Sequence, residues 1–178
     1  MPPEAVSNPI VVFISSSQDE FNSLRKRIKK ALENEPFADY SLMKGLLIED
    51  ERGPVIKQKV KTHMDKSAIY LGIFGRVRSK WTIAEFWEAR DRGIPLLIYH
   101  FKRVSRPGRP RQATGGPTSP AERFLRAHVR TLSIFVSTHH SEAGLLKKVL
   151  QDLAFQTAEL VNENAQIRKT IHKPTIEP

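Results

Sequence analysis

Three short apolar runs, each rich in β-branched residues, constrain the fold of this chain more than any other feature. They cover residues 9–14, 68–74 and 94–99. A continuous apolar run of this length, without polar alternation, is typical of a strand that is buried on both faces of a parallel sheet. Segments with helical spacing of apolar residues separate the runs, so right-handed β-α-β connections are expected.

The remaining elements extend this alternating pattern along the chain. A weaker strand signal lies at residues 40–48, and residues 131–136 are expected to form the last strand. Helices are expected at about residues 18–33, 54–64, 82–92, 120–130 and 141–166. This order predicts a flavodoxin-like, three-layer α/β fold whose five-stranded parallel sheet has the order 2-1-3-4-5. We expect a single domain over residues 1–166 and a C-terminal tail over residues 167–178.

Composition excludes several classes of protein. The 178 residues include no cysteine, so disulfides, Cys-ligated zinc and thiol catalysis are excluded. No apolar run reaches the 18 or more residues that a membrane span needs, and no signal peptide precedes the first strand. His139 and His140 have no companions at metal-ligand spacing, so no metal site is expected. A cytoplasmic protein without a membrane contact is the prediction.

The positive charge of the chain is concentrated in one segment. Lys and Arg minus Asp and Glu give 16 − 13 = +3 for residues 1–101, 8 − 1 = +7 for residues 102–130 and 5 − 5 = 0 for residues 131–178. Residues 102–119 also contain several glycines and prolines, which predicts a flexible basic loop. The candidate anion-binding residues in this loop are Arg103, Arg106, Arg109 and Arg111. Nucleic acid is a less favoured ligand for them, because aromatic residues are not interleaved with the charges.

The predicted strand order places a ligand crevice between the first and third strands, beyond their carboxyl ends. Two loops meet there, at residues 15–19 and 75–85, and Glu85 is the candidate catalytic carboxylate. Trp81 precedes it by one helical turn and could provide an aromatic wall for a base. The other candidate substrate-binding residues are Ser15, Ser16, Ser17, Asp19, Phe74, Gly75 and Arg76.

Two capping patterns offer a structural alternative for these residues. Thr82 and Glu85 have the spacing of a capping box, and so have Ser17 and Glu20. In that case Glu85 ties down the start of a helix and has no chemical role.

Several of these segments resemble known families. Residues 11–17 with Asp19, Phe21 and Arg25, and residues 68–76, resemble a TIR-like domain family of unknown function found at the N-terminus of NTPase-containing signalling proteins. The pair Trp81 and Glu85 is similar to the W-x-x-x-E segment of TIR domains that hydrolyse NAD. Residues 85–95 also resemble a helix of nucleoside deoxyribosyltransferases. The fuller TIR motif after the second strand is missing around residues 52–54.

These resemblances imply an enzyme that breaks an N-glycosidic bond of NAD or a related nucleoside through Glu85, without a cofactor. They also imply self-association, a role in immune signalling, and further domains in a longer protein. Two alternatives remain: a non-catalytic signalling or nucleotide-sensing module, and an anion- or nucleic-acid-binding module built on residues 102–130.

Overall fold

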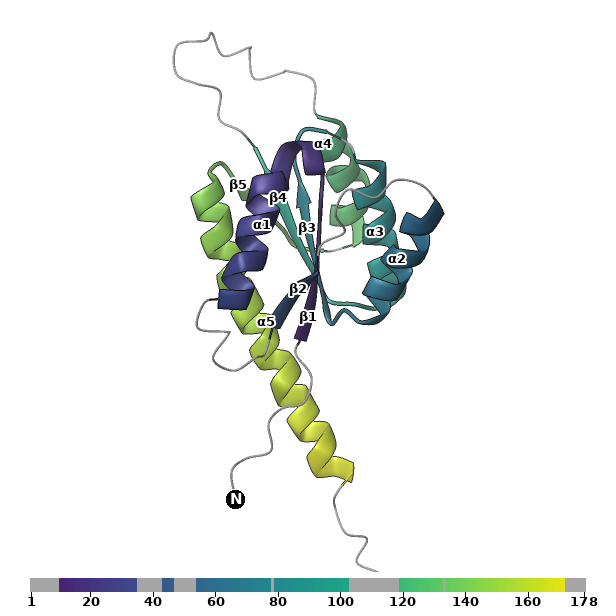
Figure 1. Cartoon of the computed structure of the whole chain (residues 1–178), viewed down its shortest axis with the longest axis vertical. Coiled ribbons are helices and arrows are strands. Elements are labelled where there is room, and N and C mark those ends of the chain that lie inside the picture. Colours follow the sequence, from purple (N-terminus) through teal and green to yellow (C-terminus); the bar gives the residue numbers. More distant parts are fainter. Residues whose placement is uncertain are drawn as a thin grey trace, which may run out of the picture.

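The structure is a computed structural model that describes residues 10–34, 43–46, 54–77, 79–102, 119–132 and 134–171. Strands and helices alternate along these ranges (Figure 1). In chain order the elements are β1 (Ile10–Ser16), α1 (Gln18–Asn34), β2 (Met43–Leu46), α2 (Pro54–Asp65), β3 (Ile69–Phe74), α3 (Lys80–Asp91), β4 (Leu96–Phe101), α4 (Pro120–Phe124), the π-helix η2 (Leu125–Val129), the 3₁₀-helix η3 (Arg130–Leu132), β5 (Val136–His139) and α5 (Glu142–Ile171).

The strands form a parallel sheet in the order β2-β1-β3-β4-β5. The prediction of an α/β fold with a parallel sheet is therefore confirmed, and the arrangement is consistent with a flavodoxin-like fold. In the central pairing, Ser15 of β1 lies opposite Gly72 of β3. Since β2 and β3 flank β1, the direction of the connections reverses between β1 and β3, and the carboxyl ends of these two strands form the switch point.

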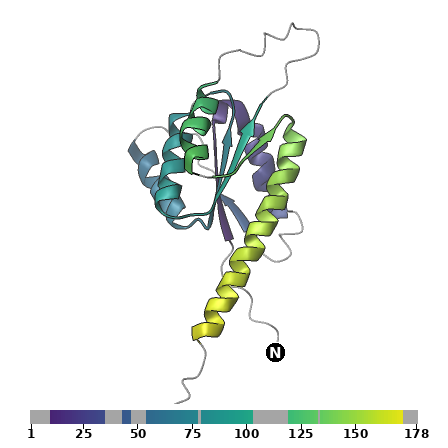
Figure 2. The same cartoon turned by 180° about the vertical axis from the view of Figure 1, so that it is seen from behind.

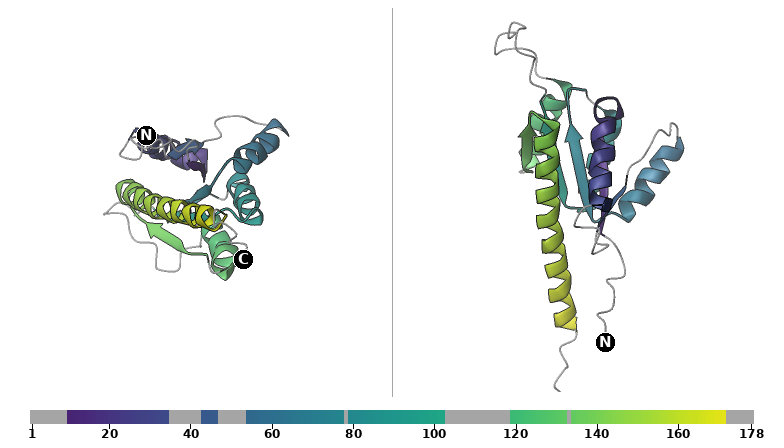
Figure 3. Two further views of the ribbon diagram at one scale, coloured as in Figure 1. Left: turned by 90° about the horizontal axis from the view of Figure 1, so that it is seen from below. Right: turned by 60° about the vertical axis from the view of Figure 1, so that its left-hand side comes forward.

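Helices cover both faces of the sheet, and alternate residues of the strands β1, β3 and β4 enter one of two cores. One core lies beneath α1 and α5 and includes Ile14, Ile28 and Val149. The other lies beneath α2, α3, α4 and η2 and includes Tyr70 and Phe86. Figures 1 and 3 show the two helical layers on opposite sides of the strands.

Helix α3 begins earlier than expected, whereas its C-terminal end agrees with the expectation. The helix begins at Lys80, and Ser79 is its N-cap, because the Ser79 hydroxyl accepts a hydrogen bond from the Thr82 amide at 3.2 Å. At the other end Gly93 has φ 67°, and the amides of Gly93 and Ile94 return to carbonyls of the last turn. This is a Schellman motif, which requires a left-handed residue that glycine supplies without strain.

The last strand is displaced from its predicted place. Residues 131–136 carry an apolar run, yet helical structure continues through η2 and η3 to Leu132, and β5 covers Val136–His139. Leu125 and Val129 explain the continuation, because both are fully buried. Phe135 is 78% exposed, so part of the apolar run does not enter the core at all.

The last helix is longer than predicted. It ends at Ile171 instead of about residue 166, and its C-terminal half extends well past the sheet (Figure 2). In the described ranges, no helix is both long enough and apolar enough to span a bilayer. The basic loop at 102–119 falls almost entirely outside the described residues, since only Lys102 and Ser119 are included.

Candidate functional site

The side chains that meet at the switch point come from β1 and α3. Ser15 is the penultimate residue of β1, and Glu85 lies in the second turn of α3. The Ser15 hydroxyl donates a hydrogen bond to Glu85 Oε2, across 70 positions of sequence. Two of the candidate residues are therefore in direct contact at the switch point.

Glu85 does not form a capping box. Ser79 is the N-cap of α3, so Glu85 is the sixth residue of the helix and lies beyond the first turn. The Thr82 amide is taken by the Ser79 hydroxyl, and the Glu85 carboxyl is bonded to Ser15. The capping interpretation of Thr82 and Glu85 is therefore wrong, and the reason is that a serine three positions earlier satisfies the helix start.

The Glu85 carboxyl has an unusual protonation state. Its residue is 9% exposed, and burial raises its pKa from 4.5 to about 7, although the Ser15 hydrogen bond and the charge of Arg25 oppose the rise. An ionised carboxylate is stabilised by water, and this position supplies little water. The Glu85 carboxyl therefore titrates closer to neutral pH than an ordinary glutamate does.

Two buried polar residues near Glu85 were not among the predicted site residues. Tyr70 is fully buried, and its hydroxyl donates to the Thr82 carbonyl at 3.2 Å. Burial raises the pKa of Tyr70 well above its usual value, and the negative charge of Glu85 adds to this rise. Arg25 is 5% exposed. Its position one turn after Phe21 and one turn before Ile28, on the apolar face of α1, was the available signal.

The three serines do not act as one group, because strand residues alternate between faces. Ser15 points towards α3, as its bond to Glu85 shows. Ser16 is the next residue of β1 and therefore faces the layer of α1 and α5; its hydroxyl is buried and has no hydrogen-bond partner among the described residues. Ser17 is buried, and its carbonyl accepts from the Phe21 amide. Of the three predicted serines, Ser15 is the one that contacts Glu85.

The remaining predicted residues lie at different depths. Phe74 is 4% exposed and its ring stacks on Phe124 with centroids 5.6 Å apart, which places it in the core. Asp19 and Arg76 are exposed. Trp81 is 45% exposed in the first turn of α3, four positions before Glu85 and so on the same side of the helix.

A contact between helix α1 and the β3–α3 loop was not predicted. The carboxylate of Glu20 accepts hydrogen bonds from the backbone amides of Arg76 at 2.9 Å and Val77 at 3.0 Å. A side chain on Gly75 would force its neighbours to shift, since a Cβ there would lie 2.6 Å from Glu20 Oε2 and 2.7 Å from the Phe21 ring. The capping interpretation of Ser17 and Glu20 is therefore replaced by a contact between α1 and the β3–α3 loop.

The predicted anion-binding residues belong to a segment outside the described part of the chain. Arg103, Arg106, Arg109 and Arg111 lie outside the described residues. Beside them, Lys102 and Arg126 both form ion pairs with Glu122, at 3.0 and 2.8 Å. Part of the positive charge of residues 102–130 is therefore neutralised within the fold, and nucleic-acid binding stays a prediction. Among the described residues, no group of three or more His, Asp or Glu side chains could hold a metal ion.

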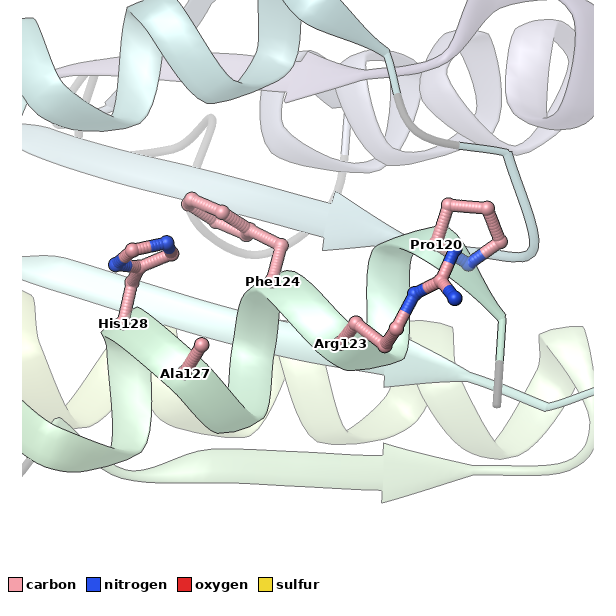
Figure 4. Close-up of a pocket in the computed structure, with 5 residues that line it drawn as sticks. All are labelled: Pro120, Arg123, Phe124, Ala127 and His128. Atoms are coloured by element: carbon pink, nitrogen blue, oxygen red, sulfur yellow. The ribbon is translucent and has the colours of Figure 1, made fainter. Parts of the chain in front are cut away.

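A small hollow lies away from Glu85, along α4 and η2. It measures about 150 Å³ and is lined by Pro120, Arg123, Phe124, Ala127 and His128 (Figure 4). Phe124 separates it from the core, because the same ring packs on Phe74 and Phe86. The hollow is therefore a surface feature of the α4–η2 layer and does not include the switch point.

Together these features define an α/β protein with a buried carboxyl at the switch point of its sheet. No protein-family profile matches the sequence, and no curated protein does. A solved structure described as 2-desoxiribosyltransferase from Leishmania mexicana is similar to part of the chain. The TM-score is 0.42 and the identity 19%, over 56% of this chain and 68% of that one. An overlap this limited does not establish a shared activity.

Proposed function

We propose that this chain breaks the N-glycosidic bond of a nucleoside or nucleotide, NAD included, and that Glu85 is its catalytic carboxylate. The observation that carries the proposal is the position of the Glu85 carboxyl, which is buried at the β1–β3 switch point, has a pKa of about 7 and is held by Ser15. Perturbed carboxyls at such positions are characteristic of functional sites, because burial of a charge is costly to stability.

The chemistry requires a negative charge beside the sugar. When the bond between C1′ and the base nitrogen breaks, its electron pair leaves with the nitrogen and C1′ becomes oxocarbenium-like. The ionised Glu85 carboxylate would stabilise this centre or bond to it, and water would then supply the oxygen at C1′ and release a proton, which balances the proton that the base of an uncharged nucleoside takes up as it leaves. Nicotinamide in NAD is already cationic before it leaves, so this reaction needs no acid to protonate it.

Ser15 and Trp81 have supporting roles in this proposal. The Ser15 hydrogen bond fixes one carboxylate oxygen and favours the ionised form, so Ser15 is a positioning residue. Trp81 offers an exposed aromatic face close to Glu85 on which a base or nicotinamide ring could stack.

The resemblance to TIR-like domains extends the proposal. On that basis the chain would be a cytoplasmic signalling domain of a longer protein, acting in immunity and active after self-association. The pattern of Trp81 and Glu85 and residues 68–76 support this part, and assays should therefore include a high protein concentration.

The test is product formation from NAD, from purine and pyrimidine nucleosides and from their 2′-deoxy forms, with chromatographic detection of the free base. Wild type should release base, and Glu85→Gln should release it at least about a hundredfold more slowly, the scale for loss of a key transition-state interaction. Glu88→Gln is the matched control, one turn further along α3 and paired with Arg92 at the surface. Equal release by wild type and Glu85→Gln would refute the role of Glu85.

One observation favours a non-catalytic alternative. The Glu85 carboxyl is deeply buried and its Oε2 already has a partner in Ser15, which is also what a structural contact between β1 and α3 would require. A nucleotide-sensing module would then bind its ligand without turnover. Saturable binding by calorimetry with no base released, retained in Glu85→Gln, would identify this case.

A further inference from the structure

The loop that approaches the candidate site from β3 presents two backbone amides to solvent-accessible space, and both are occupied. The amides of Arg76 and Val77 donate to Oε1 and Oε2 of Glu20, so a single carboxylate accepts from both. Successive backbone amides that converge on one point are a common cradle for phosphate and carboxylate groups. In this chain the cradle is filled by the protein's own anion.

The local structure holds Glu20 in this place. Glu20 lies in the first turn of α1, and the helix is kinked at Phe21, where φ is −132° and ψ is 16°. The Phe21 ring packs against the main chain at Gly75, which has no side chain to keep it away. The turn that carries Glu20 is thereby fixed over the β3–α3 loop.

A ligand phosphate at this loop would meet two obstacles. It would find both amides already engaged in charge-assisted hydrogen bonds, which are among the stronger kind. It would also approach a fixed negative charge at contact distance, which is shorter than the distance over which salt screens charges. The exposed Arg76 side chain offsets this repulsion only in part, because it is free to lie in solvent.

We infer that Glu20 determines specificity at this site by occupying the anion cradle of the β3–α3 loop, so that the ligand presents no phosphate there. This inference rests on the proposed function and narrows its substrate class: an uncharged nucleoside is preferred over a nucleotide whose phosphate would reach Arg76 and Val77. The Arg76 loop therefore does not serve as the pyrophosphate site that an NAD-cleaving reaction would favour.

The direct test measures phosphate binding and does not depend on turnover. Inorganic phosphate is titrated into wild type, Glu20→Gln and the control Glu33→Gln at constant ionic strength. Glu33 is an exposed residue near the far end of the same helix, and its substitution changes the net charge equally. Glu20→Gln should bind phosphate at least about tenfold more tightly than wild type, because one repelling charge at contact distance is removed. Glu33→Gln should match wild type.

If Glu20→Gln fails to fold, a measurement on wild type alone still tests whether Glu20 occupies the cradle. In ¹⁵N-labelled protein, the amide signals of Arg76 and Val77 should stay in place as phosphate is added. Movement of both signals at millimolar phosphate, or equal phosphate affinity in wild type and Glu20→Gln, would overturn the inference.

Turnover then separates this inference from the proposed function. If base is released, the ratio of kcat/KM for a nucleoside to that for its 5′-phosphate should fall at least about tenfold in Glu20→Gln. An unchanged ratio contradicts the role of Glu20 while leaving Glu85 catalysis intact. Absence of any product with every substrate, together with the gain of phosphate binding in Glu20→Gln, refutes the catalytic proposal and supports the occupied cradle.

Discussion

Replacing Glu85 by glutamine should stabilise the fold relative to wild type, by an amount that grows as the pH rises. The pKa of this carboxyl is 4.5 in an unfolded chain and about 7 in the fold. The native state therefore keeps a proton that the unfolded chain loses between these two values, and the wild-type free energy of unfolding falls as pH rises through this window. This rise in pKa corresponds to about 3 kcal/mol in the free energy of unfolding. The contribution is present in full below the unfolded-state pKa and is lost above the folded-state pKa.

Glutamine has nearly the same shape as glutamate and carries no charge at any pH. The Glu85→Gln variant therefore does not lose this stability as the pH rises. Relative to wild type, Glu85→Gln should gain about 2 to 3 kcal/mol of stability between pH 5 and pH 8. Urea unfolding curves at several pH values in this range measure the difference directly. Glu163→Gln, at an exposed position on α5, is the matched control and should follow wild type. A Glu85→Gln curve parallel to wild type at every pH would refute the proposed burial of a titrating carboxyl.

Three further substitutions test the contacts around the site and the core. Ser15→Ala removes a hydrogen bond that lowers the Glu85 pKa, so the carboxyl titration, followed by ¹³C NMR, should move up by about one pH unit; an unmoved midpoint would count against the contact. Tyr99→Phe removes the 2.7 Å hydrogen bond to Asp152 and should cost about 1 kcal/mol in urea unfolding; no loss would mean that water replaces the bond. Gly75→Ala places a methyl group against Glu20 and should cost about 1 to 3 kcal/mol by the same measurement, whereas wild-type stability would show that the β3–α3 loop yields easily.

The central strands could be predicted from sequence because both of their faces are buried. In β3, Leu71 is buried on one face of the sheet and Tyr70 on the other, so the whole segment is apolar. The edge strand β5 carried no such signal. Phe135 belongs to an apolar run but remains exposed, while the buried Val129 extends the preceding helix.

The candidate site could be predicted in location but not in its contacts. Spacing placed Glu85 at the switch point, yet the same spacing suggested a capping box with Thr82, and only the position of Ser79 resolves the two. The partner of Glu20 is a pair of backbone amides 56 and 57 positions away. Almost every residue type carries a backbone N–H, so the residues that donate this way cannot be recognised from the sequence. No sequence pattern could therefore have indicated this contact.

The bond between Ser15 and Glu85 joins residues 70 positions apart, and it exists only where β1 and β3 lie side by side. Contacts of such long range form late in folding, since a long loop must close before they contribute. The contact between Ser15 and Glu85 therefore depends on the pairing of β1 with β3, because a shift of β1 would move Ser15 relative to α3.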